Sequence, residues 1–391
     1  ENTIIVYWSD HGVGLPRAKR WLYDSGTRIP LIVRIPEKYR TPRQGKPGTV
    51  DDQLISSLDF GNTTLNLAGL PAPPVTQGRA FLGKNLTPPR DYIYGARDRM
   101  DERYDIIRSV RDKRYRYIRN YEPLKPYFQY MNTPEKGATM KELRRVAATG
   151  KMPAAMKLFM AKRKPVEEFY DLENDSHEIN NLAKDPAHQV ILNRFRKVHQ
   201  KWSTETRDLG LIPEPEMVIR EKKAGSRYDI LAKTDDKTLL ERLGRMALLA
   251  SDGEKSLPEL IKGLDDKDSA VRYWAAIGIG NTGELSEKAK DACVKVLAEE
   301  SSTVVRVATA RALLRMKVEE ERALSELSKS LESPEEWSRL HAAITLDEAE
   351  EQARPALPSL QKALTKQPNK YIVRVANKAV NDLLKTNNTV K

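Results

Sequence analysis

The run Trp8-Ser9-Asp10-His11-Gly12 contains the residues best suited to chemistry in this sequence. It ends an apolar segment, Thr3–Trp8, that is typical of a buried strand. Sheets place ligand sites just beyond the ends of such strands, and a carboxylate beside an imidazole suits a divalent metal ion. The alternative is that Asp10 caps the turn that Gly12 begins. On these residues alone, both interpretations stand.

Residues 1–90 contain the elements that would hold this site. Pro30–Ile35 is typical of a second buried strand, and Leu54–Ala68 has the apolar spacing of a helix. Strand, helix and strand in alternation indicate an α/β sheet. We therefore predict an α/β core over residues 1–90.

Residues 91–210 have a different pattern, rich in aromatic and β-branched residues. Strands are predicted at Tyr92–Tyr94, Ile106–Val110 and Tyr115–Ile118. The tight connection Arg111-Asp112-Lys113 indicates an antiparallel hairpin between the last two. Helices are predicted over 136–160 and 186–206, the second begun by Asp185-Pro186. Together these elements predict a small antiparallel α+β subdomain.

Residues 211–235 separate this subdomain from the last part of the chain. They contain Pro213, Pro215 and the charged run Glu221-Lys222-Lys223, with little apolar periodicity. We predict a linker here.

Residues 236–391 repeat. Four arginines recur at intervals of 34, 33 and 35 residues, each followed by alanines and apolar residues at helical spacing: Arg272, Arg306, Arg339 and Arg374. Second helices are predicted between them, at Leu257–Leu264, Ala289–Leu297, Ala323–Leu331 and Pro358–Leu364. A period near 34 with two helices per unit is typical of an all-α solenoid, and the pattern resembles HEAT-like repeats. We expect each arginine to reach the neighbouring repeat.

The residues after Gly12 favour the metal interpretation of Asp10. With the run Ser9–Gly12, the sequence KRWLYDSGTRIP of Lys19–Pro30 resembles the sulfatase family, which carries Ser-Asp-(Asn/His)-Gly, a lysine and Tyr-(Glu/Asp)-x-Gly-x-Arg-x-Pro. Ser25 stands where a second glycine is usual. Further segments resemble the C-terminal signature of the family and its sulfamidase-like branch: Glu168–Ala183, Ile107–Asn120 and Trp202–Pro213. The resemblance covers about residues 1–215.

The resemblance implies a sulfatase-like α/β sheet and a hydrolase of sulfuric esters or sulfamates, acting on sulfated carbohydrate or aryl sulfate. It implies that Asp10 and His11 ligate a calcium ion, and that Lys19 contacts a sulfate oxygen as the catalytic residue. A divalent cation and an ammonium group stabilise the negative charge that a sulfate ester concentrates under attack.

The family's formylglycine nucleophile has no counterpart in this sequence. It is made in a Cys/Ser-x-Pro/Ala-x-Arg motif, beside an Asp pair that completes the metal shell, and neither is present. Cys293, the one cysteine, lies in a predicted repeat helix and is expected to be core filler. We therefore expect an N-terminally truncated core whose missing part carries the formylglycine, and no sulfatase activity from residues 1–391 alone.

The net charge of +12, from 67 Lys and Arg against 55 Asp and Glu, is unevenly placed. Residues 235–391 hold 25 basic and 26 acidic residues, so residues 1–234 hold 42 and 29. A basic half favours an anionic partner such as a sulfated substrate, and a solvated basic surface is the alternative. The candidates for substrate contacts are Arg97, Arg99, Asp101 and Glu102, for which a charged sheet face is the alternative.

Several classes of function are excluded or left open. No stretch reaches the roughly 20 apolar residues of a membrane span. Because the solenoid is nearly neutral, we expect no nucleic acid, and a protein is the possible partner of the repeats. Export to the periplasm or outside the cell is implied by the resemblance only, since residues 1–391 do not include a signal peptide. The alternatives are a phosphoester or phosphonate hydrolase of the same superfamily, and a non-catalytic helical-repeat scaffold.

Overall fold

The computed structural model describes residues 2–41, 44, 46–283, 286–365 and 367–390. The chain forms two compact units that do not follow sequence order. The first unit comprises Glu1–Ala96, Arg108–Arg119 and Glu167–His199. The second unit comprises Arg97–Ile107, Asn120–Val166 and Gln200–Lys391.

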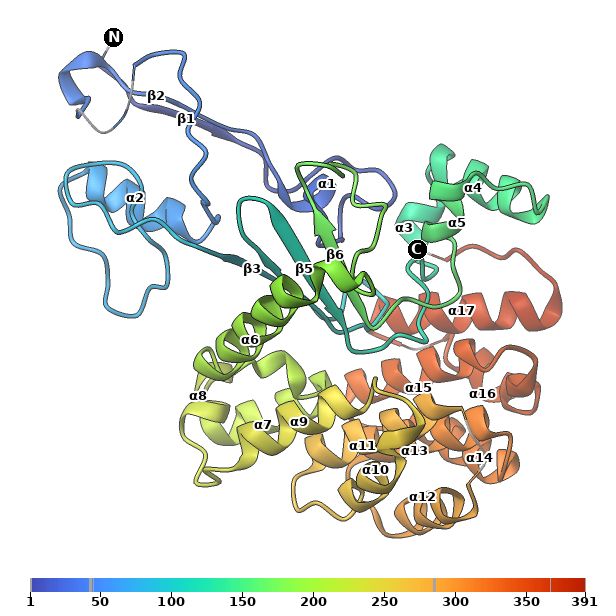
Figure 1. Ribbon diagram of the computed structural model, residues 1–391. Helices are drawn as coiled ribbons and strands as arrows, with labels where there is room; N and C mark the ends of the chain where they lie inside the picture. The colour runs from blue at the N-terminus through green and yellow to red at the C-terminus, as the bar shows by residue number, and fades with distance from the viewer. Residues whose placement is uncertain (1, 42–43, 45, 284–285, 366, 391) are drawn as a thin grey trace. The chain divides into compact units, whose positions relative to one another are not determined.

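The first unit begins with a two-stranded antiparallel ribbon (Figure 1). Strand β1 (Ile5–Trp8) pairs with β2 (Leu31–Arg34), with Trp8 opposite Leu31. The two predicted strands are therefore present. In the described residues these strands are not buried: Tyr7 is 61% exposed and Ile32 is 64% exposed. A two-stranded ribbon has few neighbours that could cover its side chains. The other helical segments of this part are α1 (Asp24–Thr27), η1 (Glu37–Tyr39) and α2 (Asp59–Leu67).

A four-stranded sheet in the order β3-β4-β5-β6 forms the centre of the first unit. Its strands are β3 (Ile93–Arg97), β4 (Ile107–Arg111), β5 (Tyr115–Asn120) and β6 (Glu167–Asp171). The hairpin predicted from Arg111-Asp112-Lys113 is confirmed. Helix α6 (Gln189–Glu205), which follows η3 (Pro186–His188), contributes Leu192 and Phe195 to a core with Val110, Tyr117 and Phe169 of the sheet.

The second unit is helical in most of its length. Before the repeats come α3 (Asn132–Glu135), α4 (Ala138–Ala148), α5 (Ala154–Phe159), η4 (Leu209–Leu211), α7 (Glu214–Ala224) and α8 (Arg227–Ala232). Then follow α9 (Leu239–Leu249), η5 (Glu254–Ser256), α10 (Leu257–Gly263), α11 (Ser269–Thr282), α12 (Glu287–Glu299), α13 (Thr303–Met316), α14 (Glu320–Ser330), α15 (Glu336–Glu348), η6 (Glu350–Ala356), α16 (Leu357–Lys362) and α17 (Lys370–Leu384).

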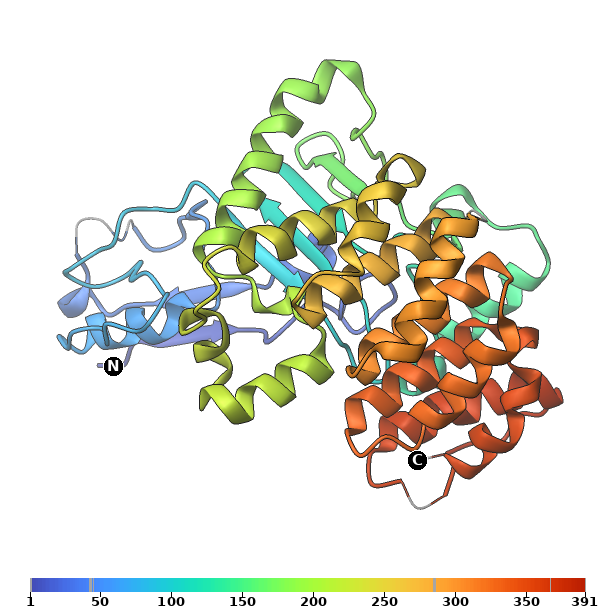
Figure 2. The same ribbon diagram turned by 90° about the horizontal axis from the view of Figure 1, so that it is seen from below.

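The helices from α10 to α17 form four successive pairs, as the repeat period predicted (Figure 2). The second helices of the pairs, α11, α13, α15 and α17, pack on one another in that order. Small residues allow the close approach. A Cβ at Gly280 would lie 3.1 Å from the Cα of Ala312, and one at Gly278 only 2.9 Å from the Cα of Ala250. A larger side chain at either position would push the helices apart.

The repeated arginines bridge adjacent repeats at two of the four positions. Arg272 of α11 donates to the Glu300 carboxylate at 2.6 Å, and Arg306 of α13 donates to Glu326 of α14 at 2.7 Å. Arg272, Arg306 and Arg339 also donate to a backbone carbonyl six residues earlier, at 2.8, 2.9 and 2.6 Å. The same side chain therefore closes the turn before each of these three helices.

The segment 211–235 is not the linker that its composition predicted. Pro215 lies in the first turn of α7, where a missing N–H costs nothing, and Lys222 and Lys223 lie in the last turn, where cations favour the helix dipole. Leu211, Ile212, Ile230 and Leu231 are buried in the core of the second unit. The signals taken for a linker are the start and stop signals of a short helix.

No helix in the described ranges has both the length and the apolar content that crossing a membrane requires.

Candidate functional site

Asp10 and His11 lie in the loop directly after β1, in the first unit. The Asp10 side chain is 84% exposed, and its Oδ2 lies 3.5 Å from Nε2 of His11. The Gly12 N–H donates to the carbonyl of Gly26 at 2.9 Å, which ties this loop to α1. A Cβ at Gly12 would lie 2.0 Å from the Ser25 carbonyl oxygen, so only glycine permits this contact.

The two side chains fit a calcium ion incompletely. Calcium takes six to eight oxygen ligands. Within the described parts of the chain, no group of three or more His, Cys, Asp or Glu residues is arranged to hold a metal ion. Asp10 and His11 can therefore supply part of a shell, and the other ligands would have to come from elsewhere.

Lys19 lies in the same loop, between Asp10 and the motif that begins at Tyr23. Its backbone N–H donates to the carbonyl of Val13 at 3.1 Å, while its side chain is half-buried. The neighbouring Ala18 and Trp21 are 2% and 5% exposed, so they anchor the segment that carries the lysine. This arrangement fixes the backbone at Lys19.

Asp24 of the same motif is held by two arginines of the sheet. Arg111 of β4 binds it with both ends of the guanidinium, at 3.0 and 3.1 Å, and Arg116 of β5 donates to it as well. Burial raises the pKa of Asp24, but the charges of Arg116 and Arg111 outweigh this and hold it below the usual range. Asp24 is therefore a structural anion that fastens the site loop to the hairpin.

Two buried glutamates of the C-terminal signature complete this attachment. Glu178 accepts the Asp24 N–H at 2.7 Å and faces Nε of Arg116 at 2.7 Å. Burial raises the pKa of Glu178 to about 6, against the opposing charge of Arg116. Glu168 accepts hydrogen bonds from the hydroxyls of Tyr23 and Tyr170, each at 2.7 Å.

The two segments that carry the sulfatase resemblance, 19–30 and 168–183, are thus joined by direct contacts. Sequence reasoning did not identify Arg116, which contacts both Asp24 and Glu178, or Arg111, which binds Asp24. The only signal was that both arginines lie in the predicted hairpin, and this does not reveal a partner that is 87 to 92 residues away.

The four candidates for substrate contacts lie in the second unit, with Arg97 at the end of β3 and the other three in the segment after it. Arg97 faces Asp105 at 3.5 Å and is 3% exposed. Arg99 donates to Glu214 at 2.6 Å and lies 4.2 Å from the Trp337 ring centroid. These contacts fix both guanidinium groups.

The acidic members of this loop differ from each other. Glu102 is 1% exposed, accepts the Asn132 N–H and lies 3.4 Å from Nη1 of Arg374. Asp101 is half-buried and has a positive φ of 52°, which marks the turn of the loop. Substrate contact by these residues stays a prediction.

Cys293 is fully buried in α12, and burial alone raises the pKa of its thiol to about 12. A thiol in this state is not a nucleophile at neutral pH. The prediction that it fills the core is confirmed.

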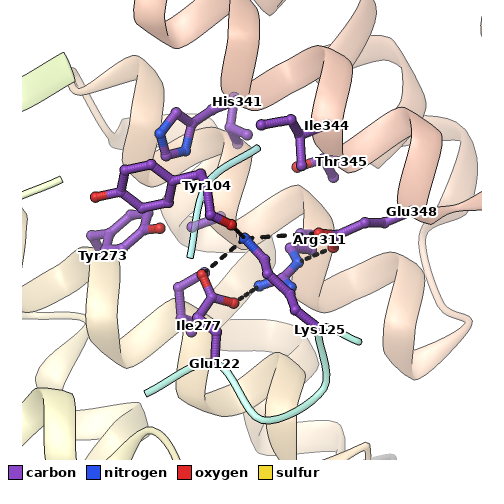
Figure 3. A pocket seen from close by; sticks show the side chains of 12 residues that line it. Tyr104, Glu122, Lys125, Tyr273, Ile277, Arg311, His341, Ile344, Thr345 and Glu348 are labelled. Carbon is purple, nitrogen blue, oxygen red and sulfur yellow. Dashed lines mark hydrogen bonds and ion pairs between the residues drawn. The ribbon is translucent and has the colours of Figure 1, made fainter. Parts of the chain in front are cut away.

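A polar cavity of about 20 Å³ lies within the second unit, among Tyr104, Glu122, Arg311 and His341 (Figure 3). That volume accommodates one water molecule. It is too small for a sugar, so this cavity is not a substrate site.

Comparison with known proteins gives two family matches. Residues 16–147 match the model described as N-sulphoglucosamine sulphohydrolase, C-terminal. Residues 228–314 match the model of HEAT repeats.

Among curated proteins, an ulvan-active sulfatase of Formosa agariphila is 42% identical over 218 residues, which cover 56% of this chain and 36% of the relative. A second ulvan-active sulfatase of the same organism is 31% identical over 216 residues, or 54% of this chain and 39% of the relative. The human N-sulphoglucosamine sulphohydrolase is 27% identical over 235 residues, or 56% of this chain and 45% of the relative.

The chain therefore spans less than half the length of each of these relatives. Residues 16–147 are therefore similar to the C-terminal region of N-sulphoglucosamine sulphohydrolases, and residues 228–314 are similar to HEAT repeats.

Proposed function

We propose that this chain supplies the lysine and two metal ligands of a sulfuric ester hydrolase that acts on sulfated carbohydrate. The observation that carries the proposal is the loop of residues 9–24. It presents Asp10, His11 and Lys19, and Arg111 and Arg116 hold it on the sheet through Asp24. A 42% identical relative is named as a sulfatase that is active on ulvan.

The chemistry of the loop suits a sulfate group. The ammonium group of Lys19 would pair with a sulfate oxygen and stabilise the charge that grows there as the ester bond breaks. Asp10 and His11 would contribute to holding a calcium ion, which when bound supplies electrostatic stabilisation of the same charge. The nucleophile of the reaction is not among the residues of this sequence.

The basic first part of the chain supports an anionic substrate, since residues 1–234 hold 42 basic and 29 acidic residues. Export, periplasmic or extracellular, belongs to the same proposal, because polymeric sulfated carbohydrate is encountered outside the cell. We include Arg97, Arg99, Asp101 and Glu102 in the proposal as substrate contacts. We expect their substitution to lower turnover less than substitution of Lys19. Arg97, Arg99 and Glu102 form ion pairs within the chain, so their substitution should reduce stability more than catalysis.

The test is a chimera in which the N-terminal part of the 42% identical sulfatase, up to the aligned segment, precedes residues 1–391. We expect it to hydrolyse an aryl sulfate or N-sulfoglucosamine in the presence of calcium, whereas residues 1–391 alone should show no turnover. Lys19→Ala in the chimera should lower kcat/KM by about 10² to 10³, as loss of one charge-stabilising donor does. Asp10→Ala should in addition raise the calcium concentration needed for half-maximal rate.

The matched control is Lys46→Ala, which removes an exposed lysine of the same unit and should leave turnover unchanged. Equal turnover of the Lys19→Ala and unaltered chimeras would contradict the proposal. So would multiple turnovers by residues 1–391 alone. Hydrolysis of an aryl phosphate in preference to the sulfate would support the phosphoester alternative.

A further inference from the structure

One face of the repeats is already covered by the chain itself. The helices α11, α13, α15 and α17 present side chains to two segments outside any helix or strand, 98–106 and 121–131, which we call the docked loops. All of these residues lie in the second unit. We propose that the partner of the HEAT-like repeats on this face is the pair of docked loops rather than a separate protein.

Aromatic contacts form the apolar part of this interface. The ring of Tyr104 lies 4.4 Å from the ring of His341 on α15, and that of Tyr121 lies 5.8 Å from Trp274 on α11. Tyr104, Tyr121 and Trp274 are at most 3% exposed. Fully buried aromatic residues of this kind carry most of the energy of protein interfaces.

A buried charge cluster forms the polar part (Figure 3). Glu122 of the docked loops accepts from Arg311 of α13 at 2.8 Å, and Arg311 donates to Glu348 of α15 at 2.7 Å. Lys125 lies 3.1 Å from Glu122 and donates to the Tyr104 carbonyl at 2.8 Å. Burial raises the pKa of Glu122, but the charges of Arg311 and Lys125 hold it well below its usual range.

The interface continues along the row of helices. Arg103 binds Asp347 of α15 at 2.7 Å, and their side chains are 3% and 11% exposed. Glu102 faces Arg374 of α17 at 3.4 Å. Arg374 is the last of the four arginines that recur in the repeats. In the last repeat this arginine contacts a docked loop.

These contacts make the face complementary to the docked loops in shape and in charge. Four buried charges of the loops face an opposite charge on the repeats: Glu102, Arg103, Glu122 and Lys125. The fifth, Asp105, pairs with Lys164 instead. Breaking a pair with the repeats leaves an uncompensated ion in a dry environment. A separate protein could bind here only by displacing both loops. The repeats therefore hold the docked loops in place.

Hydrogen exchange of the unaltered chain of residues 1–391 tests the proposal directly. The docked loops lie outside helices and strands, and some of their amides donate to carbonyls of the loops themselves, as those of Arg103 and Tyr121 do to Met100 and Ile106. Isolated bonds of this kind open readily, so strong protection requires that the loops be held against the repeats. We expect buried amides of 102–106 and 121–125 to exchange at least 100-fold more slowly than unprotected amides. Unprotected rates would show that the face is open and would overturn the proposal.

Variants on the repeat side test which residues hold the loops. Asp347→Asn combined with Arg374→Gln should speed exchange in 98–106 at least tenfold, although neither position is in the loops. Lys362→Gln is the matched control, because Lys362 of α16 forms an exposed pair with Glu332, and its loss should not change exchange in 98–106. Exchange in 98–106 that is equal in the double variant and the control would contradict the proposal.

A charge exchange distinguishes direct contact from general loosening. Asp347→Lys and Arg103→Glu should each speed exchange in 98–106, and the two together should recover at least threefold of the lost protection. No recovery would mean that the pair does not hold the loop. The outcome does not depend on sulfatase activity, so it is separate from the test of the proposed function.

Discussion

The N-terminal ribbon and the repeats use apolar residues in opposite ways. Ile5, Tyr7, Trp8 and Ile32 of the ribbon are 48% to 64% exposed, whereas Leu313 and Leu340 of the repeats are fully buried. Each repeat helix finds its cover in the next helix along the chain. In the described residues the two strands of the ribbon pair with each other, and Trp8 also contacts Phe60 of α2, with 5.3 Å between the ring centroids. Apolar side chains are therefore buried in the repeats, where the helices that cover them are close in sequence, and exposed in the ribbon, where such neighbours are few.

The largest difference between the two regions should appear in proteolysis. Residues 68–77 are all exposed and lie outside helices and strands, whereas 211–235 forms α7 and α8 over a buried core. We expect thermolysin to cut first within 68–77, with cleavage in 211–235 on the order of 100-fold slower. Mass spectrometry of the early fragments measures this. A first cut in 211–235 would restore the linker interpretation.

The next largest difference between the two regions should be in how much the truncation of one apolar side chain lowers the free energy of unfolding. Leu313→Ala removes a fully buried side chain of α13 and should lower the free energy of unfolding by about 3 kcal/mol. Ile32→Ala, at a position that is 64% exposed, should change it by less than about 0.5 kcal/mol. Urea unfolding followed by circular dichroism measures the change in unfolding free energy for Leu313→Ala. Hydrogen exchange of β2 measures it for Ile32→Ala. Similar losses for the two variants would remove the contrast.

Acidification should affect the two units in opposite directions. Burial, with the charges of Lys125 and Arg311, lowers the pKa of His341 in the second unit to about 3. Because the folded state resists protonation, stability is lost as pH falls below 6.5, by about 2 kcal/mol at pH 5. The carboxylates of Glu122 and Glu348 oppose this shift, and Tyr104 and Tyr273 also face the imidazole.

For Glu178 in the first unit the sign is reversed, since its pKa is raised to about 6 from 4.5. Its contribution is fully present below pH 4.5 and is lost as pH rises through 6, by about 1 kcal/mol between pH 5 and 7. Hydrogen exchange at pH 5 and 7 reports each unit separately. His341→Leu should remove the acid sensitivity of the repeats, and Glu178→Gln should flatten the opposite trend around β6. Identical pH dependence in both units would contradict these assignments.

The smallest expected effect is the loss of a helix cap. The Asn369 side chain accepts the Tyr371 N–H at 2.9 Å at the start of α17. Asn369→Ala should lower the free energy of unfolding by about 1 kcal/mol, and Asn369→Ser, which keeps an acceptor, should lose less. Thermal unfolding measures both. Equal losses for the two variants would show that the cap hydrogen bond is not the cause.

The sequence by itself determined the local elements of this protein. The hairpin at Arg111-Asp112-Lys113, helix α6 and the paired helices of the repeats all follow from patterns within about 35 residues. In the repeats this was enough for the packing too, since the partner of Arg272 is only 28 residues away. Asp10, His11 and Lys19 were singled out by the motif around them, and their roles stay a proposal.

Only the tertiary structure decided the long-range pairings. Nothing in the sequence placed Arg111 and Arg116 on Asp24, or Glu122 on Arg311, 189 residues later. The tertiary structure also shows that the segment predicted as a linker forms two packed helices. Leu211 and Ile230 are buried in a core that the local sequence pattern does not reveal. The physical reason is that a buried charge or an isolated apolar residue is stable only with its partner, and sequence periodicity records neighbours along the chain but not partners in space.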